Sequence, residues 1–524
     1  MSEDTPTARN EPAGDDDVAP SRHHELVPVV ALGGSAGAIE ALQAFFEDVP
    51  AECPIAFVVA VHLDPEHESR LPELIGRSTA LPVLQLTGQE PVRKGTVYVI
   101  PPRKLIRMEG GALALEEREP EPDRPVTVDL LFRSLADSHG AHSAAVVLSG
   151  ADGDGAIGIK RVKERGGLTV AQDPEECGHP AMPRSAIATG MVDWTLPVAD
   201  MVPRLLAYFR LEGHLRLPSE VAPPAPAAAS REGDDEVTLR EILAFVRTRT
   251  GRDFTGYKRA TIVRRIARRM QVNGTDHLTG YLNFLRTRPG EALLISVTNF
   301  FRDAECFQAL EPHLRELLRG KAAGEPVRVW VPGCATGEEA YSLAVMLCDY
   351  AREMDSPPHI QVFATDLDEE AIRVARDGLY PLSIEADVSQ EWLRRYFSKE
   401  HRGYRVRREV REMVLFAEHD LLKDSPFSRL DLVSCRNLLI YLEREVQQRV
   451  FQTFHFALRP QALLFLGASE SCEDEGNLFS VVDKKNRIFM QRPLARPMVP
   501  VPARPSALGQ VMLPRRPHEL SIPG

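Results

Sequence analysis

The sequence lacks the features that identify several specialised classes of protein. Its seven cysteines are scattered over 524 residues without a Cys-x-x-Cys pair, which favours reduced, buried thiols in a cytosolic protein. No apolar run approaches the roughly 18 residues of a membrane helix. The N-terminus, MSEDTPTARNEPAGDDD, is acidic and polar, unlike a secretory signal. We therefore expect a cytoplasmic protein with no direct membrane insertion.

A basic excess is lacking as well. The formal net charge is -12, which argues against a nucleic-acid binder that relies on phosphate contacts. Hydrophobic residues make up 43% of the chain and charged residues 26%, as is ordinary for a globular protein. Because 524 residues are too many for one hydrophobic core, the length predicts two or three domains.

Shifts in composition divide the chain into segments. Acids and prolines predict disorder at the N-terminus, and prolines with alanines predict a linker in the middle. Alternating strand and helix patterns predict an α/β fold with two doubly wound, parallel-sheet, Rossmann-like domains and a small all-α subdomain before the second. The predicted segments are 1–25 (disordered), 26–217 (first α/β domain), 218–236 (linker), 237–290 (helical subdomain), 291–492 (second α/β domain) and 493–524 (disordered, proline-rich tail).

Three residues of the types used in nucleophilic hydrolysis follow predicted strands of the first domain. Ser35 follows VVALGG, His62 follows AFVVAV, and Asp154 lies in the loop after AAVVL. The carboxyl ends of parallel strands meet at one edge of a sheet, so these side chains are expected to converge. A serine, a histidine and an aspartate in that arrangement act as nucleophile, base and orienting acid. Backbone N–H groups at the helix start after Ser35 can stabilise an oxyanion.

Other interpretations of the first pattern stay open. A glycine-rich turn between strand and helix also binds nucleotide phosphates or simply turns the chain, and a histidine at a strand end is often structural. His67 competes with His62, although it lies in the polar run DPEHES, and Asp152 competes with Asp154.

Six ordered segments of the first domain resemble the chemotaxis protein-glutamate methylesterases of CheB type. They are LGGSAGAIEAL, VVAVHLDP, VYVIPP, VDLLFRSLA, VVLSGADGDGAIG and AQDP with AMPRSAI, and they cover about residues 27–212. The resemblance implies that Ser35 is the nucleophile, His62 the base and Asp154 the third member of a triad. The usual members carry an N-terminal receiver domain, which we do not expect here because only about 25 polar residues precede the first strand.

The second α/β domain contains a glycine turn that is rich in acids. In VRVWVPGCATGEEAYSLAVML, Gly333 and Gly337 bracket the turn. Glu338 and Glu339 open the following helix, where they disfavour a phosphate but suit the ammonium and sulfonium groups of S-adenosylmethionine. Asp366 ends the next strand, IQVFATD, where an acid typically binds ribose hydroxyls. Strand–turn–helix units of this kind also bind NAD or no ligand at all. An alternative role for Asp366, as a solvated helix cap, stays open.

From about residue 237 to 492 the chain resembles the chemotaxis receptor glutamate methyltransferases of CheR type. The matching segments are GRDFTGYKRATIVRRIARRM, VTNFFRD, GCATGEEAYS, FATDLDEEAI, GLYP, LRRYF, HDLL, CRNLLIYL and ALLFLGASES. The resemblance implies S-adenosyl-L-methionine as cofactor, and no His/Cys cluster offers a metal site. The cofactor contacts that it implies are Ser296, Thr298, Arg302, Glu338, Asp366, Asp420, Leu421, Arg436 and Asn437. Ser296 and Asp420 stand where asparagine is common, and both can still form hydrogen bonds.

A predicted helix in YKRATIVRRIARRMQVNG carries a basic face. Its apolar residues recur at helical spacing on one side, and on the other recur Arg264, Arg265, Arg268 and Arg269. The face is either a solvated surface or a docking surface for an acidic helical substrate, and the resemblance favours docking.

The two resemblances together imply a bifunctional enzyme. The C-terminal half would methylate glutamates on the cytoplasmic helices of methyl-accepting chemoreceptors or of a similar signalling protein. The N-terminal half would hydrolyse the methyl esters and deamidate glutamine at the same sites. Two alternatives stay open: an active methyltransferase with a non-catalytic, esterase-like docking or regulatory module, and a non-enzymatic signalling scaffold.

Overall fold

The computed structural model divides the chain into two compact units. The first unit takes the residues up to Arg302 together with Asp377–Arg408, and the second takes Asp303–Arg376 together with the residues from Glu409 onward. The residues described are 26–62, 70–102, 104–117, 127–212, 214–215, 217–218, 231–250, 254–287, 298–322, 325–400, 403–473 and 477–493.

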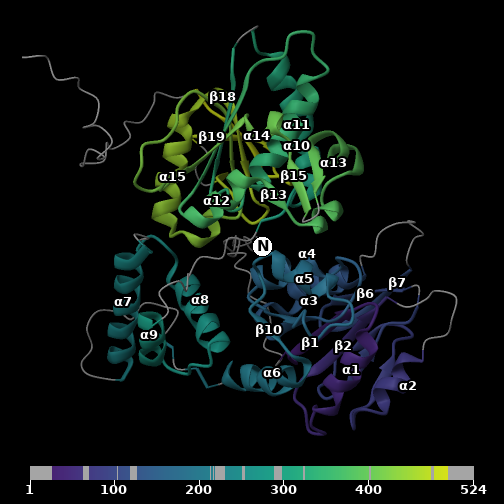
Figure 1. Cartoon of the computed structure of the whole chain (residues 1–524). Helices are drawn as coiled ribbons and strands as arrows, with labels where there is room; N and C mark the ends of the chain where they lie inside the picture. The colour runs from purple at the N-terminus through teal and green to yellow at the C-terminus, as the bar shows by residue number, and fades with distance from the viewer. Residues whose placement is uncertain are drawn as a thin grey trace, which may run out of the picture. The chain divides into compact units, whose positions relative to one another are not determined.

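A seven-stranded parallel sheet organises the first unit (Figure 1). Its strands, in spatial order, are β10 (Trp194–Leu196), β9 (Leu168–Gln172), β8 (Ser143–Val147), β1 (Val29–Gly34), β2 (Ala56–Val61), β5 (Val97–Val99) and β3 (Val83–Gln85). The helices that accompany it are α1 (Ala38–Glu47), α2 (Leu71–Gly76), α3 (Thr127–His139), α4 (Ala156–Glu164), α5 (Ala181–Ala188) and α6 (Val198–Glu212). The same unit contains a separate small antiparallel sheet of β4 (Glu90–Pro91), β6 (Lys104–Glu109) and β7 (Ala112–Glu117).

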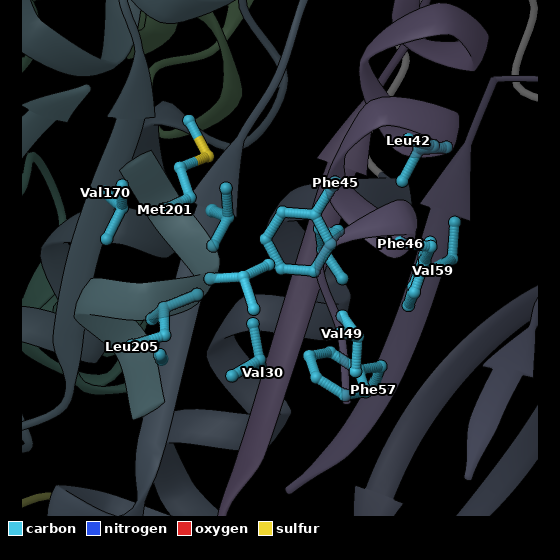
Figure 2. Packing of buried hydrophobic residues seen from close by; sticks show 14 of the residues in the cluster. Val30, Leu42, Phe45, Phe46, Val49, Phe57, Val59, Val170, Met201 and Leu205 are labelled. Carbon is cyan, nitrogen blue, oxygen red and sulfur yellow. The ribbon is translucent and has the colours of Figure 1, made fainter. Parts of the chain in front are cut away.

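The period of two along the strands sorts the core into two layers. On β1, Val30 and Leu32 join the cluster that contains helices α1 and α6, with Phe45 and Leu205 among its members (Figure 2). Residues in between point to the other face, where Ala31 packs with α3, α4 and α5. Because both faces are covered, every residue of β1 is buried, and the strand reads as a continuous apolar run.

The first unit also contains a helical subdomain and a small antiparallel sheet. The helical subdomain consists of α7 (Arg231–Thr250), α8 (Arg259–Val272) and α9 (Leu278–Thr287). Helix α7 begins at Arg231, inside the stretch whose composition predicts a linker; acids follow in its first two turns, where they favour a helix N-terminus. The segment from Asp377 adds an antiparallel sheet in the order β13 (Leu379–Tyr380), β15 (Gly403–Val406), β14 (Phe397–Glu400), with η2 (Leu382–Ala386) and α13 (Gln390–Tyr396).

The second unit is built on a seven-stranded mixed sheet. In spatial order the strands are β16 (Val414–Glu418), β12 (Ile360–Asp366), β11 (Val327–Pro332), β17 (Leu430–Cys435), β18 (Leu458–Leu466), β20 (Ile488–Gln491) and β19 (Phe479–Asp483). The first five run parallel, and the last two form an antiparallel hairpin on the edge. Figure 1 shows helices on both sides of this sheet: α10 (Ala304–Arg319), α11 (Glu338–Ala351), α12 (Glu369–Asp377) and α15 (Arg444–Ala457).

The predicted fold class is confirmed: two doubly wound α/β domains and an all-α subdomain before the second. All seven cysteines are free, and all except Cys177 are buried. Within the described residues, no helix is both long enough and apolar enough to span a bilayer.

Candidate active sites

The first candidate site begins at the sharp turn after β1. Ser35 follows the strand, and Gly37 adopts a positive φ of 76° as it caps α1. A Cβ on Gly37 would lie 2.8 Å from Oγ of Ser149, so the turn admits only glycine there. The Ser35 N–H donates to the carbonyl of Ser149, which ties the turn to the end of β8. The half-buried Ser35 side chain is therefore held at the carboxyl edge of the sheet.

His62 lies between two carboxylates at the same edge. It follows β2, which pairs with β1, and both aspartates come from the loop between β8 and α4. The ring Nε2 is 2.8 Å from Oδ2 of Asp154, and Nδ1 is 2.9 Å from Oδ2 of Asp152. The Ser35 side chain also helps to lower the pKa of the Asp152 carboxyl. The three strand ends that the sequence predicts to converge therefore do converge, with Asp152 as a fourth member.

Asp154 is fixed by the start of helix α3. Its Oδ2 accepts the N–H of Val128 at 2.8 Å, and its Oδ1 accepts the N–H of Asp129 and of Gly155 at 2.9 Å each. The side chain is fully buried, and the positive end of the α3 dipole stabilises a carboxylate at this place. The geometry thus gives Asp154 the orienting position against His62.

The electrostatics of this cluster favour a charged imidazole. Burial opposes the charge, but hydrogen bonds to Asp152 and Asp154 outweigh it and raise the pKa of His62 to about 9. Burial also opposes the charge on Asp152, yet the hydrogen bond from His62 lowers the pKa of that carboxyl below its usual value. Both shifts describe an imidazolium held by two carboxylates.

The second candidate site surrounds the acidic turn after β11. Gly333 and Gly337 have φ values of 69° and 94°, and Ala335 between them has a φ of 48°. A Cβ on Gly337 would lie 2.8 Å from Cβ of Ala375, so the turn can pack against its neighbour only with glycine. Glu338 starts α11 with its side chain buried, and it accepts a hydrogen bond from the Thr336 hydroxyl at 2.6 Å.

Asp366 ends β12 directly beside this turn. Its Oδ2 accepts the N–H of Ala335 at 2.8 Å, and its Oδ1 accepts the N–H of Asp368 at 2.9 Å. Asp368 in turn accepts the N–H of Glu370 in the first turn of α12. Asp368 therefore takes the helix-cap role that was open for Asp366, and Asp366 joins the glycine turn to the end of the neighbouring strand.

The turn is a region of negative potential. Burial is the first cause that raises the pKa of the Cys334 thiol well above its usual value, and the charges of Asp366, Glu339 and Glu338 follow. Acids so placed repel a phosphate and attract a cation. A ligand that carries both an ammonium and a sulfonium group therefore suits these three carboxylates.

The loop after β17 brings an unsatisfied acceptor to the same edge. Oδ1 of Asn437 is buried and has no hydrogen-bond partner among the described residues, and the residue adopts a φ of 59°. A buried acceptor without a partner is costly unless a ligand supplies a donor. Arg436 is placed differently: its guanidinium pairs with Asp303 at 2.7 Å and lies over the rings of Phe307 and Phe465. Its side chain thus anchors the loop within the unit.

Asp420 and Leu421 follow β16, the edge strand next to β12. The Asp420 carboxylate accepts the N–H of Leu422 at 2.9 Å and pairs with Lys423 at 3.0 Å. These local contacts shape the turn that presents both residues beyond the strand end.

Glu470 is a site residue that the sequence did not single out. Its Oε2 accepts the N–H of Asn437 at 3.0 Å and of Gly467 at 2.8 Å. Its Oε1 accepts the N–H of Leu438 at 2.9 Å and of Leu439 at 2.7 Å. One buried carboxylate thus holds the whole loop that carries Asn437. Only its place three residues after Gly467, in an otherwise polar loop, could have indicated this role.

Three predicted contacts are not among the described residues of the second unit. Ser296 is outside the described residues of the chain. Thr298 and Arg302 belong to the first unit, whereas the other cofactor residues belong to the second. His67, the alternative to His62, is also outside the described residues.

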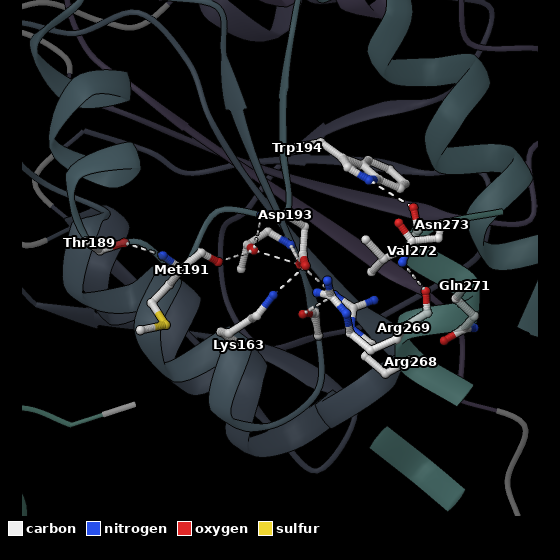
Figure 3. A network of polar contacts seen from close by, with 12 residues as sticks. Lys163, Thr189, Met191, Asp193, Trp194, Arg268, Arg269, Gln271, Val272 and Asn273 are labelled. Atoms are coloured by element: carbon white, nitrogen blue, oxygen red, sulfur yellow. Dashed lines mark hydrogen bonds and ion pairs between the residues drawn. The ribbon is translucent and has the colours of Figure 1, made fainter. Parts of the chain in front are cut away.

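The four arginines of α8 do not share one environment. Arg268 is buried: its Nη2 donates to Oδ2 of Asp193 at 2.8 Å and to the carbonyl of Gly167 at 2.6 Å (Figure 3). Lys163 pairs with the same aspartate. At the end of α8, the Trp194 indole donates to the carbonyl of Val272 at 3.2 Å, and Val272 joins the core cluster of the parallel sheet.

This placement corrects the prediction for the basic face. Arg268 is committed to the first α/β domain and is not part of an open surface. Arg264 is exposed, and Arg265 and Arg269 are intermediate in exposure, so a docking surface on α8 rests on these three.

The two folds and sites define a chain that joins a hydrolase-like α/β domain to a Rossmann-like methyltransferase domain. Three family models match it: CheB methylesterase over residues 30–205, the all-α domain of CheR methyltransferase over 238–298, and the S-adenosylmethionine-binding domain of CheR methyltransferase over 296–488. The chemotaxis protein methyltransferase of Salmonella typhimurium is 34% identical over 260 residues, which are 46% of this chain and 86% of that protein.

Two other relatives extend the comparison. An uncharacterized 104.1 kDa protein of Rhodobacter capsulatus is 36% identical over 448 residues, which are 81% of this chain. The chain spans about half of that relative, 47% of its length. The crystal structure of the Thermotoga maritima CheB methylesterase catalytic domain has 27% identity and a TM-score of 0.32, and the match covers 34% of this chain and 97% of that one.

The chain belongs to the chemotaxis methyltransferase family and carries a CheB-type methylesterase domain in its N-terminal half. Its cofactor is S-adenosylmethionine, as predicted. The matched domains are those of receptor methylation and demethylation in chemotaxis.

Proposed function

We propose that this chain is a bifunctional enzyme that methylates and demethylates glutamate side chains on cytoplasmic helices of methyl-accepting receptors. The proposal is supported by the groups at the carboxyl edge of each sheet: Ser35, His62 and Asp154 in the first unit, and Glu338, Asp366 and Asn437 in the second. Deamidation of glutamine at the same receptor positions uses the same nucleophile and is included in the proposal.

In the esterase half, Ser35 Oγ attacks the carbonyl carbon of the methyl ester while His62 accepts the hydroxyl proton. His62 then gives the proton to the departing methoxide, which leaves as methanol, and water hydrolyses the acyl-serine to glutamate. Asp154 keeps the imidazole oriented and stabilises its charge. Because the Ser35 N–H donates to the carbonyl of Ser149, the proposed oxyanion donors are the next two amides of the turn, those of Ala36 and Gly37.

In the transferase half, the residues bind and orient. Glu338 and Asp366 provide the negative potential for a cationic cofactor, and Asn437 offers its unpaired carbonyl oxygen. Bound S-adenosylmethionine supplies an activated methyl group on a sulfonium. A glutamate carboxylate is already nucleophilic, so positioning and exclusion of water provide most of the acceleration. Arg264, Arg265 and Arg269 of α8 are the proposed docking surface for the acidic receptor segment.

Two experiments separate this proposal from its alternatives. A serine-reactive phosphonate should label wild-type protein and not Ser35→Ala; equal labelling would leave the N-terminal half as a docking module. Calorimetry should detect S-adenosylmethionine binding to wild type and at least tenfold weaker binding to Asp366→Ala. Binding that is absent from wild type would favour a scaffold without turnover.

A further inference from the structure

Asp152 contacts the base of the esterase half at the ring nitrogen that Asp154 leaves open. It accepts from His62 Nδ1 at 2.9 Å, while Asp154 accepts from His62 Nε2 at 2.8 Å. Carboxylates are acceptors only, so each ring nitrogen that faces one must carry a hydrogen. The arrangement is that of an imidazolium without a free lone pair.

A general base needs the opposite state. His62 can take the Ser35 proton only when one ring nitrogen is unprotonated and faces the hydroxyl. Here each ring nitrogen faces a carboxylate, so neither is available to the Ser35 hydroxyl. The geometry is therefore that of a resting site, in which two carboxylates hold the histidine.

Other titratable and charged groups among the described residues lie next to this cluster. Besides the two aspartates that contact the ring, α3 presents Asp129, whose amide binds Asp154. Burial and the charge of Asp154 hold the pKa of Asp129 well above its usual value, which disfavours a third negative charge there. Arg133 on α3 and Asp387 after η2 act on Asp129. His179, before α5, borders the turn at Gly37.

We propose that Asp152 is a positioning residue that locks His62 in its doubly donating, protonated form and so holds the esterase half at rest near neutral pH. The lock opens when Asp152 releases Nδ1; the ring proton passes to solvent and the nitrogen becomes available to the Ser35 hydroxyl. This inference rests on the esterase function proposed above.

The lock has a measurable consequence for the pH profile. A histidine with a pKa of about 9 is neutral in about one molecule in a hundred at pH 7. In Asp152→Asn the side chain keeps its size but loses its charge, and Asp154 remains. A fall of one pKa unit would raise the neutral fraction at pH 7 about tenfold. Labelling of Ser35 at pH 7 should rise by the same factor.

The test uses the full chain and two independent readouts. The first is the NMR titration of the His62 ring, assigned with His62→Gln. The second is the pH dependence of Ser35 labelling by a fluorophosphonate, which needs neither receptor nor S-adenosylmethionine. Asp137→Asn is the matched control, because this exposed acid on α3 pairs with Arg161 and Arg165 and does not contact His62.

We expect the pH midpoints of both readouts to fall by at least one unit in Asp152→Asn and to stay unchanged in Asp137→Asn. Equal midpoints in wild type and Asp152→Asn would overturn it. Loss of labelling at every pH in Asp152→Asn would also overturn it, because Asp152 would then belong to the reacting groups. If Ser35 is unreactive in every protein, the esterase proposal fails, and the titration of His62 alone decides whether the lock exists.

Discussion

Substitution of Glu470 by glutamine tests whether this buried carboxylate holds the loop that carries Asn437 in the second unit. In Glu470→Gln, one oxygen is kept and the other becomes an NH2 group that faces two backbone N–H groups at hydrogen-bond distance. Each buried donor left without an acceptor costs about 1–3 kcal/mol, so unfolding of the second unit should become about 2–6 kcal/mol easier. Most domains have only about 5–15 kcal/mol of stability, so this loss is large. The loop that presents Asn437 should also lose its shape, which weakens S-adenosylmethionine binding at least tenfold.

The assay follows urea unfolding and cofactor binding in the same protein. Trp330 reports the second unit, provided that Trp194 and Trp392 of the first unit are replaced by phenylalanine. Glu473→Gln is the matched control: this partly exposed acid in the same loop pairs with Lys484 at 2.9 Å, and such a surface pair contributes no more than about 1 kcal/mol. A Glu470→Gln protein with wild-type stability and wild-type affinity would show that this carboxylate does not hold the loop.

Three further predictions concern other parts of the chain. Arg268→Ala should destabilise the first unit by about 3 kcal/mol in urea unfolding, because it leaves the buried Asp193 with one partner fewer. Arg264→Ala, on the exposed side of α8, should change the free energy of unfolding by less than about 0.5 kcal/mol. Equal effects of the two substitutions would show that Arg268 does not stabilise this contact. Burial, and after it the charge of His142, lowers the pKa of His139 to about 4 in the folded protein. As pH falls below about 6.5, only the unfolded protein takes up this proton, so the free energy of unfolding of the first unit should fall by up to about 3 kcal/mol between pH 6.5 and 4. In acid titrations, His139→Leu should reduce this dependence of stability on pH. Gly337→Ala should lower S-adenosylmethionine affinity in calorimetry and the melting temperature, because its φ is positive and its Cβ would meet a neighbour; unchanged values would exclude a rigid turn.

Much of the architecture is readable from the sequence because it depends on local patterns. Continuous apolar runs such as Val29–Gly34 are buried on both faces of a parallel sheet, and the residue after such a run must lie at the carboxyl edge. That rule brings Ser35 and His62 together, and the loop that follows β8 at the same edge adds Asp154. The same rule places Asp366 beside the glycine turn of the second unit.

The parts that the sequence did not predict depend on contacts between distant residues. Asp152 and Asp154 are two positions apart, and only the three-dimensional structure shows that both contact His62. The basic side of α8 is uniform in sequence, yet Arg268 is buried because Asp193 and Gly167, far along the chain, accept its guanidinium. No periodicity in one helix reports the partner on which it packs.

One radiolabel followed in two products shows whether one chain carries both opposing activities. Wild type, Ser35→Ala and Asp366→Ala would be incubated with receptor-bearing membranes and tritiated-methyl S-adenosylmethionine, and protein-bound label and volatile methanol would be followed together, with Asp152→Asn included to reveal an esterase that is held at rest. We expect label in wild type and Ser35→Ala, methanol release that depends on Ser35, and neither signal in Asp366→Ala. Equal methanol release by wild type and Ser35→Ala would show that the N-terminal half does not demethylate through Ser35.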